Sequence, residues 1–424
     1  MPERHVVVLH IGAMKTGTTY LQGKAYANAE ALLDKGVELA GETWSQQIYA
    51  VQELLGMGAR DPDIRARNAG AWERLSTQMR TSEHPVSLLS MEFLAFADPS
   101  QARRVVDSLE GCEIRVVITV RDTAAVVPAL WQTTITSGGT TPWPRFRRLV
   151  RLGMRGRGRV AGLLSRVGVA TASRFAETID VPRMLRVWCS VLPPEQVHVV
   201  VVPAPGAPKD RLWHQFCEVL DVDGASFAAE PKETNESLGY PSAELVRRVN
   251  AVIELERVRD HTIVKNDLGL NNLGTRRKRE RRALLDRATL RDALGWNRRI
   301  RDAVEHHGVV VHGDLADLPA PGEDAAHAVE DEHVPPTEEE LLAAARQGAR
   351  RLRRTVRRRS QRLLPRRRRR RTRRRMRRRL HGVPAWRGAA DPVEAAVEDL
   401  VVYLSVLVRL RRRRERIRRR RRAS

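Results

Sequence analysis

Residues 6–33 read VVVLHIGAMKTGTTYLQGKAYANAEALL and contain the junction that decides the fold. An apolar run of strand length, residues 6–9, leads into a short loop rich in glycine and threonine, and a stretch of helical character follows. In a parallel sheet such a loop lies at the carboxyl edge, where backbone amides and the N-terminus of the next helix can bind an anion. The stretch therefore predicts an anion-binding turn between a buried strand and a helix.

The side chains of this loop suit a phosphate or sulfate group. Glycines let the backbone approach an anion closely, Lys15 supplies a point charge, and Thr16, Thr18 and Thr19 supply hydroxyl donors. The standard phosphate-binding loop, GxxxxGK[ST], requires a lysine directly after Gly17, whereas this chain has Thr18 there. The earlier position of the lysine argues against an ordinary ATPase or nucleotide kinase.

Further strand-length apolar runs alternate with helix-like segments along the first 320 residues. This rhythm predicts an α/β domain with a central parallel sheet flanked by helices on both faces. The expected strands are residues 6–9, 86–89, 114–120, 197–202 and 309–311, and the expected helices include residues 71–79, 100–109, 183–191 and 211–220.

Three regions interrupt the rhythm. Residues 137–168, rich in glycine and arginine, are interpreted as an insertion that can act as a lid, and residues 256–300 as a helical region with a glycine-broken middle. Residues 319–340 are rich in proline and acids, which predicts disorder. The predicted division is an α/β domain over 1–318, an acidic Pro-rich linker over 319–345 and an Arg-rich tail over 346–424.

The formal net charge of +25 is concentrated in that tail. Residues 346–424 contain 33 arginines, no lysine and five acids, a balance of +28, so residues 1–345 carry −3. Repulsion at this density predicts disorder in isolation, or a helix on an anionic surface. The tail is expected to contact polyanions or an anionic membrane surface, or to be a solubilising extension without a partner. With only Trp386 and Tyr403 available for stacking, no specific nucleic-acid readout is expected.

Other sequence features limit the cellular compartment and the kinds of metal or disulfide chemistry that are expected. The three cysteines lack CxxC spacing, which favours reduced thiols over a disulfide or a zinc site, and His306–His307 has no accompanying metal-binding pattern. The N-terminus carries no apolar leader, and residues 400–408 are too short to span a bilayer. A cytoplasmic protein, with the option of peripheral attachment at the inner membrane surface, is expected.

The segment HIGAMKTGTTYLQ (residues 10–22) resembles the 5′-phosphosulfate-binding loop of bacterial sulfotransferases that use 3′-phosphoadenosine-5′-phosphosulfate (PAPS). RVVITVRDTAAVVPALWQ (115–132) resembles the family's strand followed by Arg-Asp, which binds the 3′-phosphate. NESLGYPSAELVRRVN (235–250) and GVVVHGDLADL (308–318) resemble later family segments. The resemblance covers residues 5 to about 320 and implies a P-loop-like nucleotide-binding topology, a sulfuryl donor (PAPS), a hydroxyl or amine acceptor and no metal.

The resemblance assigns roles to individual residues. Lys15 would contact the phosphosulfate and stabilise the leaving group. Thr16, Gly17, Thr18 and Thr19 would bind the 5′-phosphate, and Arg121 the 3′-phosphate, for which a guanidinium fork is well suited. The family commonly has a serine eight residues after this arginine; here Ala129 stands there, and Thr133 is the nearest hydroxyl that could substitute. A structural ion pair with Asp122 is the alternative for Arg121.

The acceptor hydroxyl needs a base, and Glu92 follows the strand at 86–89 closely enough to face the crevice. Alternatively, Glu92 is an acid at the N-terminus of a helix, where its charge complements the helix dipole. His10, a strand histidine, and His84, before the strand, rank below it. Asn235 could close over the cofactor, and Arg247 and Arg248 could touch its phosphates or form a solvated face.

Two other functions remain open at this point. One is a degenerate sulfotransferase scaffold that binds polyanions or a membrane surface, which the substitution at Ala129 keeps in consideration. The other is a P-loop nucleotide kinase. A glycan, a glycolipid and a small metabolite are all compatible with the acceptor role.

Overall fold

The computed structural model describes residues 5–155, 178–231, 237–255, 260–323, 328–386 and 388–423. The chain divides into two compact units. The first comprises Met1–Val127, Leu149–Thr234 and Ala288–His327, and the second comprises Pro128–Arg148, Asn235–Arg287 and Ala328–Ser424. The division falls inside three helices: α7 (Thr123–Thr136), α8 (Trp143–Met154) and the first turn of α15 (Arg287–His307).

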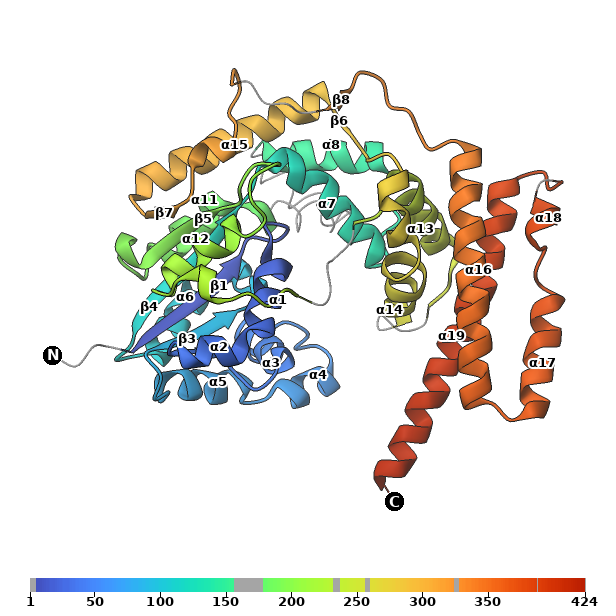
Figure 1. Cartoon of the computed structure of the whole chain (residues 1–424), viewed down its shortest axis with the longest axis horizontal. Helices are drawn as coiled ribbons and strands as arrows, with labels where there is room; N and C mark the ends of the chain where they lie inside the picture. Colours follow the sequence, from blue (N-terminus) through green and yellow to red (C-terminus); the bar gives the residue numbers. More distant parts are fainter. Residues whose placement is uncertain are drawn as a thin grey trace. The chain divides into compact units, whose positions relative to one another are not determined.

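The first unit is built on a six-stranded sheet in which every described pairing is parallel. The strand order is β2-β3-β1-β4-β5-β7, so β1 lies in the interior between β3 and β4 (Figure 1). Parallel strands leave their carboxyl ends at one edge, and the loops after β1, β3 and β4 therefore meet there. The strands are β1 (Val6–Gly12), β2 (Val37–Leu39), β3 (Val86–Ser90), β4 (Glu113–Val120), β5 (Val197–Val201) and β7 (Val310–His312).

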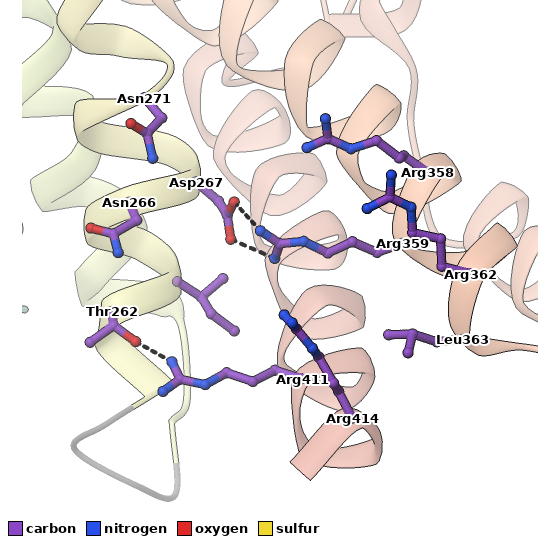
Figure 2. Close-up of a pocket in the computed structure, with 11 residues that line it drawn as sticks. Thr262, Asn266, Asp267, Asn271, Arg358, Arg359, Arg362, Leu363, Arg411 and Arg414 are labelled. Carbon is purple, nitrogen blue, oxygen red and sulfur yellow. Dashed lines mark hydrogen bonds and ion pairs between the residues drawn. The ribbon is translucent and has the colours of Figure 1, made fainter. Parts of the chain in front are cut away.

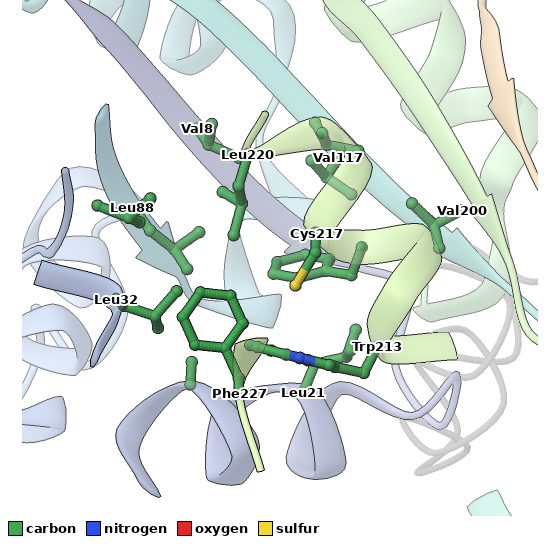
Figure 3. Packing of buried hydrophobic residues seen from close by; sticks show 14 of the residues in the cluster. Val8, Leu21, Leu32, Leu88, Val117, Val200, Trp213, Cys217, Leu220 and Phe227 are labelled. Atoms are coloured by element: carbon green, nitrogen blue, oxygen red, sulfur yellow. The ribbon is translucent and has the colours of Figure 1, made fainter. Parts of the chain in front are cut away.

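Both faces of this sheet are buried by apolar side chains. On one face Val8, Val117 and Val200 pack against side chains of α1 and α12, among them Trp213 (Figure 3). On the other face Val7 and Val116 are fully buried too, and α11 contacts β4. Burial on both sides explains why the strands read as continuous apolar runs.

The predicted α/β class with helices on both faces of a parallel sheet is confirmed. Each of the five expected strands and four expected helices is found within a few residues of its expected bounds; the short strand β2 gave no signal in the sequence. The helical elements of the first unit, besides parts of α7, α8 and α15, are α1 (Thr18–Ala27), α2 (Ala29–Asp34), α3 (Trp44–Leu54), α4 (Pro62–Asn68), α5 (Ala71–Arg80), η1 (Glu92–Phe96), α6 (Pro99–Ser108), α11 (Val181–Trp188), η2 (Pro194–Gln196), α12 (Arg211–Val219), η3 (Gly224–Ser226) and η7 (Leu315–Asp317).

The second unit is mainly helical, and α13, α16 and α19 pack against one another. α16 and α19 lie side by side in the orange and red part of Figure 1. A two-stranded parallel sheet, β6 (Leu285–Asp286) and β8 (Val329–Glu330), belongs to the same unit. Its helical elements are α13 (Tyr240–Val252), α14 (His261–Ile263), the π-helical segment η5 (Val264–Leu270), η6 (Leu273–Arg279), α16 (Glu338–Leu363), α17 (Arg366–Arg377), α18 (Val383–Trp386) and α19 (Pro392–Ala423).

The described residues of the linker and the tail include long helices, where disorder was expected for the linker and either disorder or a helix for the tail. α16 begins at Glu338 and crosses the predicted boundary between residues 345 and 346. Its Thr337 forms a capping box with Glu340, and its buried Leu352 and Val356 lie four residues apart on one face. α19 likewise buries Leu400, Leu404 and Leu407. The apolar run at residues 400–408 was recognised in the sequence, whereas the apolar stripe of α16 was not; both stripes let the helices pack despite their arginines.

Two other sequence interpretations meet the structure only in part. The expected insertion contains α8, while residues 156–168 lie outside the described part of the chain. The expected helical region at 256–300 is divided into α14, η5, η6, β6 and the start of α15, and residues 256–259 are not described. Within the described ranges, no helix has both the length and the apolar character needed to cross a bilayer.

Candidate functional site

The loop between β1 and α1 reverses direction through left-handed backbone conformations. Gly12 has a φ of +112° and Gly17 a φ of +90°, values that glycine tolerates and other residues rarely adopt. Lys15, at φ +67°, is one of two non-glycine residues with a positive φ among the described residues. Gly17 is also the N-cap of α1, so Lys15 stands directly before the positive end of the helix dipole.

The side chain of Thr16 makes its hydrogen bonds within the loop and to the neighbouring strand β4. Its side chain is buried, and its hydroxyl donates to the carbonyl of Ala13 at 2.5 Å and lies 2.5 Å from the Thr119 hydroxyl of β4. Thr119 in turn donates to the carbonyl of Gly12 at 3.0 Å. These bonds tie the loop to the neighbouring strand, so the Thr16 hydroxyl positions the backbone of the loop.

His10 lies beneath the loop as a neutral group. Burial lowers the pKa of His10 from 6.5 to about 3. Its ring nitrogens contact the hydroxyls of Ser90, at 2.8 Å, and Thr119, at 3.4 Å. The histidine therefore cross-links β1 to β3 and β4 in the core.

Glu92 and Thr18 are brought together by the sheet. Glu92 begins η1 just after β3, and its Oε2 accepts a hydrogen bond from the Thr18 hydroxyl at 2.6 Å. A Cβ built on Gly12 would lie 3.6 Å from the Cβ of Glu92, which places the carboxylate against the loop. The predicted base and the predicted anion loop thus share one location, although 74 residues separate them in the chain.

Arg121 follows β4 at the same edge. Its Nη1 donates to the backbone carbonyl of Lys15 at 3.4 Å, so the guanidinium lies beside the loop. Its neighbour Asp122 accepts hydrogen bonds from the amide of Ala124 and from the side chain of Asn297 in α15. Every residue predicted for the site, Lys15 to Thr19, Glu92 and Arg121, therefore lies around the ends of β1, β3 and β4 in the first unit.

Sequence reasoning missed three supporting residues. Thr119 was visible as a hydroxyl inside an apolar strand, a signal that could have found it. Asn297 is fully buried and bonds both Asp122 and the amide of Thr123, and Arg183 donates to the carbonyls of Ala95, Phe96 and Ala97 at the end of η1. Neither of these two carries a local sequence signal, because their partners are distant in the chain.

Other predicted contacts fall in the second unit. The hydroxyl of Thr133 donates to the carbonyl of Ala129 within α7. Arg247 and Arg248 both pair with Glu244, at 2.6 Å and 3.1 Å, so their charges are engaged on α13. Asn235 lies outside the described residues.

A cavity of about 700 Å³ lies at the outer part of the sheet in the first unit. Three carboxylates and one arginine line it, a charge balance unsuited to a phosphosulfate. The lining residues are Pro208, Asp210, Arg211, His214, Gln215, Glu218, Gly313 and Asp314. Among the described residues, no group of three or more histidine, cysteine or acidic side chains is arranged to hold a metal ion.

Comparison with known proteins gives no significant match: no family model, no curated protein and no solved structure. The geometry of the loop and the residues around it is therefore the basis of any functional assignment.

Proposed function

We propose that the first unit is a sulfotransferase that moves a sulfuryl group from PAPS to a hydroxyl or amine acceptor. The contact that carries the proposal is the 2.6 Å hydrogen bond from Thr18 to Glu92, which joins an anion-binding loop to a carboxylate. An anion site alone would suit many nucleotide-binding proteins. A carboxylate beside it adds the base that transfer to a hydroxyl requires.

The strand order β2-β3-β1-β4-β5-β7, with the loop after an interior β1, supports a P-loop-like topology for this unit. The residues present fit PAPS: the N-terminus of α1 and Gly17 would offer backbone amides to an anion, Lys15 adds positive charge, and Arg121 lies beside Lys15 as a second cation. Thr19, in the first turn of α1, completes the set. Thr16 contributes by fixing the loop.

When bound, PAPS supplies a sulfuryl group attached to a phosphate leaving group. Glu92 takes the proton of the acceptor hydroxyl as its oxygen bonds to sulfur. Lys15 would hold the phosphosulfate and would stabilise the negative charge of the leaving group, a type of contact worth several kcal/mol of barrier. Thr18 holds the Glu92 carboxylate in place through the hydrogen bond to Oε2.

The remaining parts of the proposal concern location and partners. A cytoplasmic enzyme is proposed, held at polyanions or at the anionic inner face of the membrane by its arginines. The acceptor is a hydroxyl-bearing molecule such as a glycan, a glycolipid or a small metabolite. Ala129 supports the competing possibility of a scaffold without turnover, because it lacks the hydroxyl expected there.

The test is a mass-spectrometric screen of candidate acceptors incubated with the full-length protein and PAPS. The expected result is an acceptor that gains the mass of one SO₃ group, with the product reduced by about 100-fold or more in Glu92→Gln. The Thr18→Val variant should lose part of the rate and Thr18→Ser should retain it, because serine keeps the hydroxyl. Transfer of phosphate from ATP, with no sulfation, would instead favour a nucleotide kinase.

A further inference from the structure

A pocket lined by arginines lies within the second unit. It shares no residue with the proposed sulfotransferase site. It has a volume of about 470 Å³ and opens between α16, α19 and the α14–η5 segment (Figure 2). Five arginines and a single acid line it. The lining residues are Thr262, Ile263, Asn266, Asp267, Asn271, Arg358, Arg359, Arg362, Leu363, Arg411 and Arg414.

Two of the five arginines are held by protein groups. Arg359 makes a two-fold ion pair with Asp267, each N···O distance being 2.8 Å. Arg411 bonds the hydroxyl of Thr262 (Figure 2). It also pairs with Glu415 at 3.2 Å. The pocket wall is therefore fixed at two points, one on each long helix.

The other three arginines lack such partners. Among the hydrogen bonds and ion pairs of the described residues, none involves the guanidinium groups of Arg358, Arg362 or Arg414. Arg358 and Arg362 lie one turn apart on α16, and both are exposed. Like charges gathered around one cavity repel, and a bound anion would remove that repulsion.

The two helices that carry these groups pack against each other. α16 and α19 pack through buried leucines, including Leu352, Leu404 and Leu407, so their arginines project from a packed pair of helices. Asn266 and Asp267 belong to η5, a π-helical segment of seven residues. Such segments are rare and occur frequently at functional sites. The side-chain amides of Asn266 and Asn271 add neutral donors to the wall.

We propose that this pocket binds a small ligand with two or more phosphate or sulfate groups. Planar guanidinium forks match the oxygens of such groups, and a cavity of this volume admits a small molecule, whereas a duplex or a bilayer surface would touch only its rim. This site is independent of the proposed sulfotransferase function, since none of its residues belongs to the β1–α1 loop or its surroundings.

The test titrates the full-length protein with inorganic tripolyphosphate by calorimetry at fixed ionic strength. The expected result is a binding event that Arg358→Gln with Arg362→Gln weakens by on the order of tenfold or more, because charge-assisted hydrogen bonds are lost. Orthophosphate should bind more weakly than tripolyphosphate. Hydrogen exchange should slow on ligand addition at residues 262–271 and 358–363.

The matched control neutralises two arginines with the same spacing on α17, Arg367→Gln with Arg371→Gln, which do not line the pocket. All four positions are exposed, so both double variants should keep the circular dichroism and melting temperature of the unaltered protein. The control should bind within about twofold of wild type. Equal weakening in the two double variants, or exchange protection elsewhere only, would overturn the proposal.

A third variant separates this site from the proposed catalytic one. Lys15→Met should retain the tripolyphosphate affinity of the pocket, whatever it does to nucleotide binding. Binding that Lys15→Met abolishes and the α16 double variant leaves unchanged would place the anion at the β1–α1 loop and contradict the pocket assignment.

Discussion

Gly17 combines a special backbone conformation with a close contact. Its φ is +90°, and a Cβ added there would lie 2.6 Å from the Cδ2 atom of Leu212 in α12. Gly111 has the same φ but no atom within 4 Å of such a Cβ. Comparing alanine substitutions at Gly17 and Gly111 therefore separates the effect of backbone strain from the effect of steric crowding.

Gly17→Ala is expected to lower the free energy of unfolding by about 1–3 kcal/mol, and Gly111→Ala by about 1 kcal/mol, because only the first adds crowding to strain. Urea unfolding of both variants measures the difference. When Leu212 is also replaced by alanine, Gly17→Ala should lower the free energy of unfolding by no more than Gly111→Ala does. An unchanged excess at Gly17 would show that Leu212 is not its cause.

His10 should contribute to the acid sensitivity of the protein. Its folded-state pKa is about 3, below the value of 6.5 expected in the unfolded chain. The unfolded state then binds the extra proton, so the stability from neutral His10 is present above pH 6.5 and is lost as the pH falls towards 3. The slope is at most about 1.4 kcal/mol per pH unit.

The stability difference between wild type and His10→Gln should therefore shrink as the pH is lowered from 6.5 to 4, as measured by urea unfolding at each pH. Carboxylates titrate in both proteins and cancel in the difference. A difference that stays constant over this range would mean that His10 is not held neutral in the fold.

At the level of single residues, the sequence was informative where chemistry and position coincide. Lys15, Gly17 and Arg121 follow apolar strands, and parallel strands bring their exits to one edge. The sequence did not indicate that the Thr16 hydroxyl contacts the Thr119 hydroxyl of β4. Which way a hydroxyl turns depends on neighbouring strands that local sequence does not describe.

At the scale of secondary structure, the capping box of α16 allows a direct test of whether the start of this helix is ordered. Thr337 accepts from the amide of Glu340 at 3.2 Å, and Glu340 accepts from the amide of Thr337 at 2.8 Å. Thr337→Ala removes one of these bonds and should lower the free energy of unfolding by about 1 kcal/mol, whereas Thr337→Ser should be nearly neutral. Hydrogen exchange over residues 338–345 measures the local effect. Equal exchange in all three proteins would contradict the capping role.

The elements of the sheet were predictable because burial on both faces makes a strand wholly apolar. The helices α16 and α19 lack such a simple pattern, because each has only a narrow apolar stripe and arginines occupy the rest of its surface. The π-helical turn of η5 had no signal at all, because its hydrogen-bond pattern depends on packing in the second unit. Thus the sheet of the first unit was predictable from the sequence, whereas for the second unit only helical character in parts of it was, and not how its helices pack.

For the chain as a whole, the packing of α13 limits where it can be shortened. Leu245, Val246 and Val249 of α13 are fully buried, and α13 contacts both α16 and α19. Truncation after residue 345 cuts α16 after about two turns and removes α19. The shortened protein should bind the dye ANS strongly and melt at a lower temperature, because apolar surface is exposed. An unchanged melting curve would show that the tail helices do not stabilise the second unit.

The account rests on the β1–α1 loop as the site that binds PAPS, and nucleotide titration tests this most directly. Calorimetry of the full-length protein with adenosine 3′,5′-bisphosphate, without metal, should show binding that Lys15→Met and Arg121→Gln each weaken by about tenfold or more. Lys35→Met, an exposed lysine before β2, should bind like wild type. Absence of binding by the wild type, or equal affinity in all four proteins, would contradict the claim.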